Sequence, residues 1–370
     1  MKKINYWCLF LLFFIFFGCI TDKENNYLEA KSYKIIGESL VFNNTEGNCL
    51  IKNNISNLTL YSIDSKRNRI YYKENIDYVV TKNRIKRTIN SSIPNFAGHN
   101  VVTNLEGTFT FGYSPRNPSL TIPFHVYADY NFEDVETVYG EFNKNFLSPS
   151  LKEKLNNKED IKIGSIGTSI TSGAHTLEKF YFDSDKQSYI YLLANAINKI
   201  YKNDVSVKNY SQGGSSVSDA FNLLPTMLED KNDIIVIEFG MNDHIGSNWS
   251  ANISSFEDKL GTLIDKFQQS GTNVIIVGFF QQNQNWDLEF EGSTFIFNQV
   301  LSNLAKKYNC YFADINGEFS KYSQKKINED LCGDFMHHPT SFGHLLYYKT
   351  LIPVFLSENK SDGFVYDLLK

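Results

Sequence analysis

The chain has 370 residues, of which 42% are hydrophobic and 15% aromatic, so it is long enough for two domains with buried cores. Its formal net charge of −5 comes from 36 basic and 41 acidic residues that are interspersed along the sequence. The sequence has no basic stripe that could neutralise a run of phosphates, which argues against nucleic acid as a partner.

Residues 1–19 have the pattern of an export signal. Lys2 and Lys3 precede an apolar run, WCLFLLFFIFFG, that is too short for a comfortable membrane span. A glycine stands directly before Cys19, which resembles the lipobox of bacterial lipoproteins and implies that Cys19 is lipidated. The alternatives are an ordinary signal peptide with a chance cysteine, or an uncleaved anchor. We expect an exported protein of the cell envelope, held by its lipid anchor alone on the outer surface or the periplasmic face, with residues 20–32 as a tether.

Three further cysteines, Cys49, Cys310 and Cys332, follow the signal. Their odd number and their spacing predict neither a disulfide framework nor a thiolate zinc site. At most one disulfide could form, and Cys310 with Cys332 is the candidate pair.

Residues 33–142 have a β pattern, in which short segments rich in β-branched and aromatic residues alternate with turn clusters. Strands at this spacing predict a small antiparallel β-sandwich, which we interpret as an accessory domain. The polar stretch of residues 143–160 is the predicted linker. The predicted strands cover residues 33–42, 57–64, 69–80, 107–113 and 119–130.

Strands and helices alternate over residues 161–370, which predicts a parallel sheet covered by helices on both faces. Ligands of such sheets bind beyond the carboxyl ends of the strands. Ser254 and Glu257 can form a capping box at the start of one helix. The predicted strands cover residues 161–167, 205–210, 233–240, 273–280 and 311–315, and the predicted helices cover 187–202, 216–228, 254–271, 295–308 and 341–355.

Polar clusters follow three of these strands, and a fourth cluster precedes the last helix. Acyl transfer needs a nucleophile, a base, a carboxylate that orients the base, and donors for the oxyanion. Each cluster alone is more often a turn or a helix cap, but four in order at strand ends favour a hydrolase site. The clusters are Gly167 to Gly173, Asn209 to Ser215, Gly240 to Asp243, and Asp334 to His344.

These clusters resemble the sequence blocks of the SGNH or GDSL hydrolases, over about residues 160–358. Gly167 to Ile170 resembles Gly-Asp-Ser-Leu, with Thr168 in place of the aspartate. Asn209 to Gly214 matches Asn-x-x-x-x-Gly, and Gly240 to Asp243 matches Gly-x-Asn-Asp. The block Asp-x-x-His-Pro is matched imperfectly after Asp334. The resemblance implies an α/β fold of the SGNH (flavodoxin-like) type, with a three-layer arrangement around a parallel sheet.

The resemblance also implies the site residues. Ser169 is the expected nucleophile, and Asp334 is the expected orienting carboxylate. The expected oxyanion hole consists of the backbone N–H groups of Ser169 and Gly214 and the side-chain amide of Asn242.

The base is either His337 or His338. His337 keeps the family's three-residue spacing from Asp334, but His338 is the histidine followed by proline. Proline biases His338 towards an extended backbone, and Gly343 falls at the family's distance from His338. We therefore favour His338.

Other residues of these clusters receive weaker interpretations. His175 and His244 could touch substrate, although satisfied loop histidines are the more common case. His337, His338, His344 and Asp334 could form a metal cluster, but His344 begins a helix, so we predict no metal and no cofactor. Trp286 could line a sugar site or pack at its rim.

The pattern as a whole predicts a serine esterase that forms an acyl-enzyme. We expect short acyl esters, acetyl above all, on carbohydrate or another small ester substrate. A lipase or thioesterase for longer chains is one alternative. A surface glycan-binding lipoprotein with an inert hydrolase domain is another.

Overall fold

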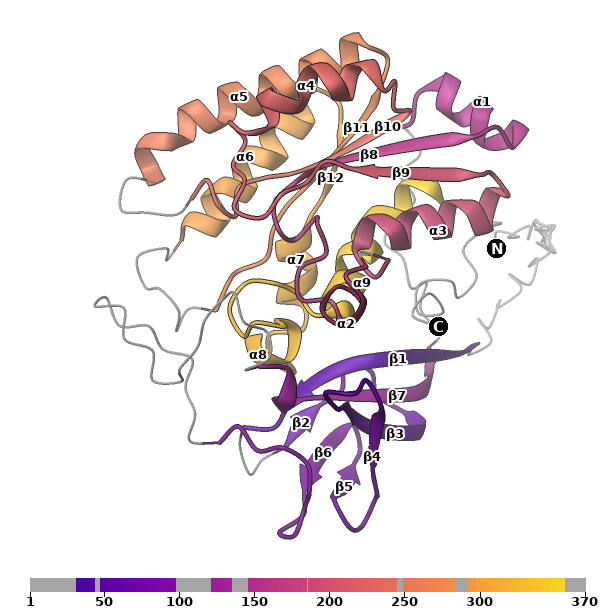
Figure 1. Ribbon diagram of the computed structural model, residues 1–370, viewed down its shortest axis with the longest axis vertical. Coiled ribbons are helices and arrows are strands. Elements are labelled where there is room, and N and C mark those ends of the chain that lie inside the picture. The colour runs from indigo at the N-terminus through magenta and orange to yellow at the C-terminus, as the bar shows by residue number, and fades with distance from the viewer. Residues whose placement is uncertain are drawn as a thin grey trace, which may run out of the picture.

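The computed structural model describes residues 31–43, 47–97, 121–134, 146–184, 186–244, 249–283 and 292–356. Antiparallel sheets at the N-terminal side lie against a larger α/β domain, so the predicted fold class is confirmed (Figure 1). Among the described residues, no helix combines the length and the apolar character that crossing a membrane requires. The export signal with Cys19, the predicted strand 107–113 and Trp286 lie outside the described residues.

The N-terminal region, which we call the β domain, contains two antiparallel sheets. One has the order β1-β7-β3-β4 and the other β2-β6-β5. Side chains of one face, such as Leu40, Leu60 and Ala128, are fully buried, as expected for strands with one face on a core. The strands are β1 (Lys31–Val41), β2 (Asn48–Cys49), β3 (Ile55–Ile63), β4 (Arg69–Tyr72), β5 (Tyr78–Thr81), β6 (Arg84–Arg87) and β7 (His125–Asp134), the last preceded by the 3₁₀ turn η2 (Ile122–Phe124).

The α/β domain contains a sheet of order β12-β11-β10-β8-β9, in which all neighbours are parallel. Read from the second strand of this domain, the order is 2-1-3-4-5, the flavodoxin-like arrangement. The chain runs from β8 outwards to β9 on one side, and from β10 outwards to β11 and β12 on the other side. The strand order therefore reverses between β8 and β10, and sheets of this type bind ligands at that point. The strands are β8 (Ile161–Gly167), β9 (Val205–Asn209), β10 (Ile234–Glu238), β11 (Asn273–Val277) and β12 (Tyr311–Ala313).

Helices cover both faces of this sheet (Figure 1). One face carries α4 (Ala220–Glu229), α5 (Trp249–Gln269) and α6 (Ser293–Lys307). The other carries α3 (Tyr189–Tyr201), α7 (Ile315–Ser320) and α9 (Ser341–Leu351), while α2 (Leu177–Phe182), α8 (Asn328–Leu331) and the 3₁₀ turn η5 (Ile352–Phe355) complete that side. Buried residues occur all around α9, because it lies between the sheet and strand β1 of the β domain.

The structure differs from the sequence prediction in several places. The predicted strand 69–80 is divided into β4 and β5 by a turn. The predicted linker 143–160 contains a helix, α1 (Pro149–Asn157), whose Leu151 and Leu155 are buried. Helix α5 begins at Trp249, upstream of Ser254, so Ser254 is an interior residue and no capping box forms there. The cysteines Cys49, Cys310 and Cys332 are free thiols, so the candidate disulfide is not formed.

A buried ion pair joins the two domains. Lys326, which precedes α8, places its Nζ 2.7 Å from Oε1 of Glu38 in β1, and both side chains are fully buried. Lys326 also donates to the carbonyl of Ser39 at 2.9 Å, and Asp330 accepts from the backbone N–H of Val41 at 2.6 Å. Buried charges are tolerated only when they are paired and hydrogen-bonded, so these contacts fix α8 against β1.

Candidate functional site

Ser169 lies on the turn that follows β8, at the carboxyl edge of the parallel sheet. Strand β8 ends at Gly167, where a Cβ atom would lie 2.6 Å from both the carbonyl oxygen of Glu238 and the Thr171 hydroxyl. Glycine is therefore required for β8 to pass β10 so closely. The turn closes through the hydrogen bond from Ala174 N to Ser169 O at 3.0 Å. These constraints hold the Ser169 side chain where the strand order reverses.

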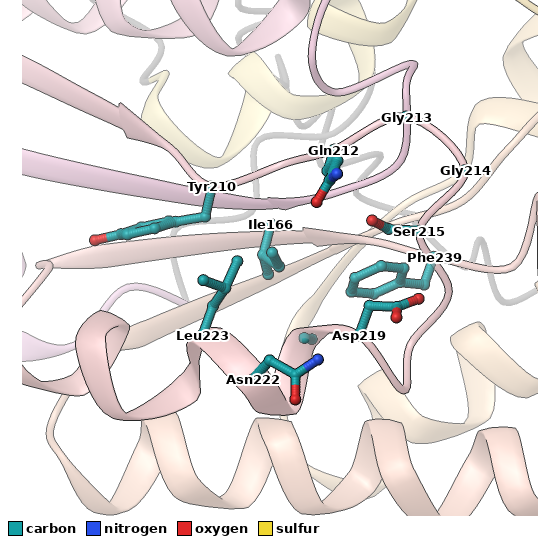
Figure 2. A pocket seen from close by; sticks show the side chains of 11 residues that line it. Ile166, Tyr210, Gln212, Gly213, Gly214, Ser215, Asp219, Asn222, Leu223 and Phe239 are labelled. Atoms are coloured by element: carbon teal, nitrogen blue, oxygen red, sulfur yellow. The ribbon is translucent and has the colours of Figure 1, made fainter.

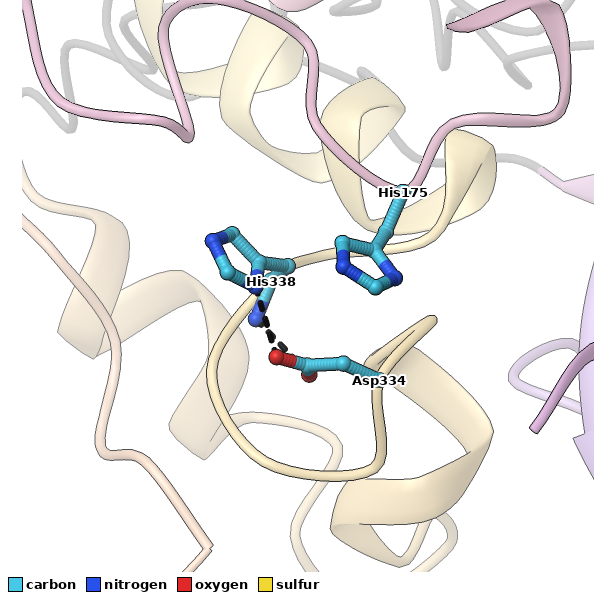
Figure 3. Close-up of side chains that lie close together, drawn as sticks. All are labelled: His175, Asp334 and His338. Carbon is cyan, nitrogen blue, oxygen red and sulfur yellow. Dashed lines mark hydrogen bonds and ion pairs between the residues drawn. The ribbon is translucent and has the colours of Figure 1, made fainter. Parts of the chain in front are cut away.

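Two hydrogen bonds link Ser169, His338 and Asp334. The Nε2 atom of His338 lies 2.7 Å from the Ser169 hydroxyl oxygen. The Nδ1 atom of His338 lies 2.6 Å from Oδ2 of Asp334, as Figure 3 shows. His337 Nδ1 is 3.3 Å from the same carboxylate oxygen, and it is the His338 ring that the structure brings to Ser169.

The loop around Asp334 surrounds its carboxylate with donors. Oδ1 accepts the backbone N–H groups of Met336, His337 and His338 at 2.9 to 3.0 Å. Complete burial of Asp334 favours the neutral form, but the neighbouring histidines and the hydrogen bond from His338 together hold the pKa of Asp334 well below its usual range. Asp334 is therefore ionised at neutral pH and accepts a hydrogen bond from the Nδ1–H of His338.

His338 is a neutral imidazole at neutral pH. Burial lowers the pKa of His338, and the carboxylate of Asp334 opposes this effect. Burial also lowers the pKa of the adjacent His337 to about 3. A neutral His338 that donates its Nδ1–H to the Asp334 carboxylate leaves Nε2 able to accept the Ser169 proton, which is the geometry of a general base beside a nucleophile.

His175 lies beside the His338 ring (Figure 3). The two rings stack with centroids 4.6 Å apart and an interplanar angle of 13°. The backbone of His175 has a φ of +64°, and a side chain at Gly333 would come within 2.8 Å of it. His175, Asp334 and His338 offer ligand atoms within 4.8 Å of one another, but both ring nitrogens of His338 already contact Asp334 and Ser169. The sequence analysis weighed substrate contact against a loop position for His175 and did not foresee its stacking on His338.

Two backbone N–H groups are available beside the Ser169 hydroxyl. In the part of the chain that the structure describes, neither the Ser169 N–H nor the Gly214 N–H donates a hydrogen bond. Gly214 has a φ of +80°, and its neighbour Gly213 is so near that a Cβ there would lie 3.7 Å from the Ser169 Cβ. Asn242 donates one amide N–H to the carbonyl of Ser215 at 2.8 Å, which leaves the second. The structure thus brings the predicted oxyanion donors to one edge of the sheet.

Side chains of the sequence blocks hold these loops together. We call the turn that carries Ser169, residues 168–174, the nucleophile turn. Asn209 donates to the carbonyl of Thr171 at 2.9 Å, which ties the end of β9 to this nucleophile turn. The carboxylate of Asp243 accepts the N–H groups of Val217 and Gly240 at 2.9 and 3.0 Å. His244 is fully buried, with Nδ1 at 2.8 Å from the Gly240 carbonyl, so its role is packing.

Glu238 is a site residue that the sequence analysis missed. It ends β10 beneath the nucleophile turn, where its Oε2 accepts the Thr168 N–H, the Thr168 hydroxyl and the Thr171 hydroxyl at 2.8 to 3.1 Å. A carboxyl group therefore contacts the turn although Thr168 replaces the family's aspartate. Burial raises the pKa of Glu238 to about 7, against the opposing effect of these hydrogen bonds. A glutamate at the end of the otherwise apolar strand IIVIE was the available signal.

A cavity of about 300 Å³ adjoins residues 212–215, which we call the glycine loop (Figure 2). It lies between the loop that follows β9, the start of α4 and the side chains of Ile166 and Phe239. The polar side chains of its lining are those of Tyr210, Gln212, Ser215, Asp219 and Asn222. The cavity could hold a polar group of a ligand next to Gly213 and Gly214.

Glu238→Gln should flatten the pH dependence of stability. Between about pH 4.5 and about pH 7 the folded protein keeps a proton on Glu238 that the unfolded chain loses, so the free energy of unfolding falls as the pH rises through this window. Glutamine cannot titrate. The free energy of unfolding, measured with urea, should fall between about pH 5 and about pH 7.5 in the wild type. This fall should be about 2–3 kcal/mol larger than the fall in Glu238→Gln. Equal declines would contradict the buried, protonated carboxyl. Asp243 and Asp330, whose pKa values burial raises to about 6, titrate in the same pH window. Both residues are present in the wild type and in Glu238→Gln, so the comparison of the two proteins isolates Glu238.

One family model matches part of this chain. Residues 165–346 match the model of the GDSL-like lipase/acylhydrolase family. A search of curated proteins finds no match. Solved structures with a similar chain include Axe2, an acetylxylan esterase from Geobacillus stearothermophilus, at 17% identity and a TM-score of 0.45 over 53% of this chain and 95% of that one. LAE5, an alpha/beta hydrolase enzyme from the metagenome of Lake Arreo in Spain, is similar at 18% identity and a TM-score of 0.44 over 52% and 94%.

The family match spans the nucleophile turn, the glycine loop, the Gly240–Asp243 turn and the Asp334–His338 loop. These are the segments that meet at the carboxyl edge of the sheet. Residues 165–346 therefore form a hydrolase domain of the GDSL-like lipase/acylhydrolase family.

Proposed function

We propose that the protein is a serine esterase that removes short acyl groups, acetyl above all, from carbohydrate. The observation that carries this proposal is the hydrogen-bonded series from the Ser169 hydroxyl through His338 to Asp334, with separations of 2.7 and 2.6 Å. This series is the arrangement by which a serine hydroxyl becomes a nucleophile at neutral pH.

The reaction follows from the position of these groups. Ser169 Oγ attacks the ester carbonyl while His338 Nε2 takes its proton, and the carbonyl oxygen becomes an oxyanion near the Ser169, Gly214 and Asn242 donors. His338 then gives the proton to the leaving alcohol, which leaves an acyl group on Ser169. Water attacks this acyl-enzyme as His338 takes a proton from it, and collapse of the second oxyanion releases the acid and returns the proton to Ser169. Asp334 stays ionised throughout and stabilises the protonated His338.

Two features support a polar, acetylated substrate. The sequence has the pattern of an export signal followed by a β domain, which does not suit intracellular thioesters. The cavity beside Gly213 and Gly214 carries amide and carboxylate side chains from Gln212, Asn222 and Asp219, groups that hydrogen-bond to hydroxyls. A lipase for long acyl chains is the alternative enzyme, and an inert glycan-binding protein would have no need of the Ser169–His338 hydrogen bond.

Acetyl esters should be hydrolysed far faster than octanoyl esters, because the proposed substrate carries a two-carbon acyl group on a polar alcohol. Turnover of p-nitrophenyl acetate and p-nitrophenyl octanoate by the full chain measures this preference directly, and acetylated oligosaccharides extend it to carbohydrate. Ser169→Ala is the control for hydrolysis at other groups. Faster turnover of the octanoyl ester would favour the lipase, and turnover that persists in Ser169→Ala would exclude a serine esterase.

His338→Ala should lose activity nearly as completely as Ser169→Ala, because a base and its nucleophile act as a unit. His337→Ala is the matched control, since the two rings are neighbours with centroids 4.0 Å apart but His338 is the one beside Ser169. We expect a loss of about 10⁴-fold or more in kcat for His338→Ala and a loss below about 10-fold for His337→Ala. An inactive His337→Ala beside an active His338→Ala would reverse the assignment.

The same proposal places the protein at the cell envelope, held by a lipid on Cys19. Cys19→Ala should then move the protein from the membrane fraction to the soluble fraction, because a single cysteine carries the acyl anchor. Fractionation followed by immunodetection, with Cys49→Ala as the control, measures this change. A Cys19→Ala variant that stays with the membrane would contradict the lipobox interpretation.

A further inference from the structure

The loop that carries Asp334 and His338 contains a backbone conformation that side chains rarely adopt. Phe335 has a φ of +65°, in the left-handed region that costs a residue with a bulky side chain about 1–3 kcal/mol. The conformation turns the chain so that the N–H groups of Met336, His337 and His338 all meet the Asp334 carboxylate. Something must hold Phe335 in this conformation.

The β domain supplies that restraint. The Phe335 side chain is fully buried, apart from the main core, in a small cluster with Val41, Phe96 and Met336, against which Phe124 packs. The Phe96 ring meets the Phe335 ring edge-on with centroids 4.9 Å apart, and the His125 ring lies 5.0 Å from it. Val41, Phe96, Phe124 and His125 all belong to the β domain.

Polar contacts from the β domain fix both ends of the same loop. The Thr121 hydroxyl donates to the carbonyl of Gly333 at 2.6 Å, directly before Asp334. The Ser39 hydroxyl lies 2.9 Å from the Thr340 hydroxyl, two residues after His338. From the α/β domain, Asn283 donates its side-chain amide to the carbonyl of Phe335 at 2.9 Å. The loop is thus held between the two domains.

We propose that the β domain is part of the catalytic apparatus, and that Phe96 is a positioning residue that holds Phe335 and thereby aims Asp334 at His338. The proposal rests on the proposed function for its kinetic consequences. Its structural basis is the edge-on contact of the Phe96 and Phe335 rings, which we infer restrains the Phe335 backbone at positive φ. Without that restraint the three N–H groups around Asp334 diverge, and the carboxylate loses its fixed direction.

The kinetic experiment compares Phe96→Ala with Phe132→Ala in the full chain. Phe132 is equally buried in the β domain but lies at the other end of β7, where its ring contacts Tyr33 and Tyr130. We expect Phe96→Ala to lose about 10- to 100-fold in kcat with KM unchanged. Phe132→Ala should keep kcat within about twofold although both variants lose stability. The acid limb of the kcat/KM profile should also move to lower pH in Phe96→Ala only, because Asp334 raises the pKa of His338.

A double-mutant cycle tests whether Phe96 acts through Phe335. Glycine adopts positive φ without strain, so Phe335→Gly removes the ring and the need to restrain it together. Phe96→Ala should then add little to the loss in Phe335→Gly, whereas independent roles would give additive losses and overturn the proposal. If Phe96→Ala does not fold, Phe96→Leu, which keeps an apolar side chain, replaces it in the cycle.

A substrate-free measurement separates this inference from the proposed function. The His338 Nδ1 proton shared with Asp334 should give a low-field proton resonance, assigned by its loss in His338→Ala. We expect this resonance in the wild type and Phe132→Ala, and its broadening or upfield shift in Phe96→Ala. An unchanged resonance with unchanged kcat in folded Phe96→Ala would overturn the proposal. Absence of ester hydrolysis in the wild type would refute the proposed function and leave this comparison valid.

Discussion

A buried, ionised carboxylate at position 334 is the constraint on which the rest of the site depends. Removing such a charge from water is costly, and the protein compensates with three backbone N–H groups and a histidine N–H. Those donors can converge only if the chain turns sharply at Phe335. This turn places His338, three residues after Phe335, against the Ser169 hydroxyl. The turn at Phe335 therefore both supplies donors to the buried Asp334 carboxylate and aligns His338 with Ser169.

Buried polar contacts also hold the two domains together. An ion pair between Glu38 and Lys326 is fully buried at the junction, beside the helix that leads into the Asp334 loop. Such a pair contributes little net stability compared with apolar packing, but it penalises any arrangement that separates its partners. The junction is consequently defined in register and direction, which an apolar contact alone would leave less well defined. A region that the sequence suggested was an accessory domain is built into the wall of the site.

Much of the fold could be predicted from the sequence because local patterns determine it. Alternation of apolar strands and amphipathic helices after residue 160 indicated the parallel sheet, and glycine-rich turns at the strand ends indicated where Ser169, Gly214 and Asn242 would gather. The predicted linker hid helix α1, because Leu151 and Leu155 are too few apolar residues to stand out from a polar stretch. The true start of α5 was missed because a capping pattern at Ser254 occurs inside a longer helix.

The parts of the site that escaped prediction depend on contacts between distant segments. Glu238 reads as the last residue of a strand, and only the fold places its carboxylate under the Thr168 turn. Phe335 reads as a hydrophobic residue in a loop, and its left-handed backbone follows from partners in another domain. Proximity of His175 to His338 has the same origin. No local pattern carries this information.

The contact between Ser39 and Thr340 has a consequence for folding. It joins residues that are 301 positions apart, and the neighbouring bond from Ser39 to the Asp330 carbonyl spans 291 positions. The entropy of closing so long a loop rises only slowly with length, by about 0.6 kcal/mol for each doubling, yet contacts of high sequence separation form late and slowly. The α/β sheet can assemble from neighbouring segments, whereas the final shape of the Asp334 loop depends on the docking of strand β1 on helix α9. The docking of β1 on α9 therefore also completes the loop that carries Asp334 and His338.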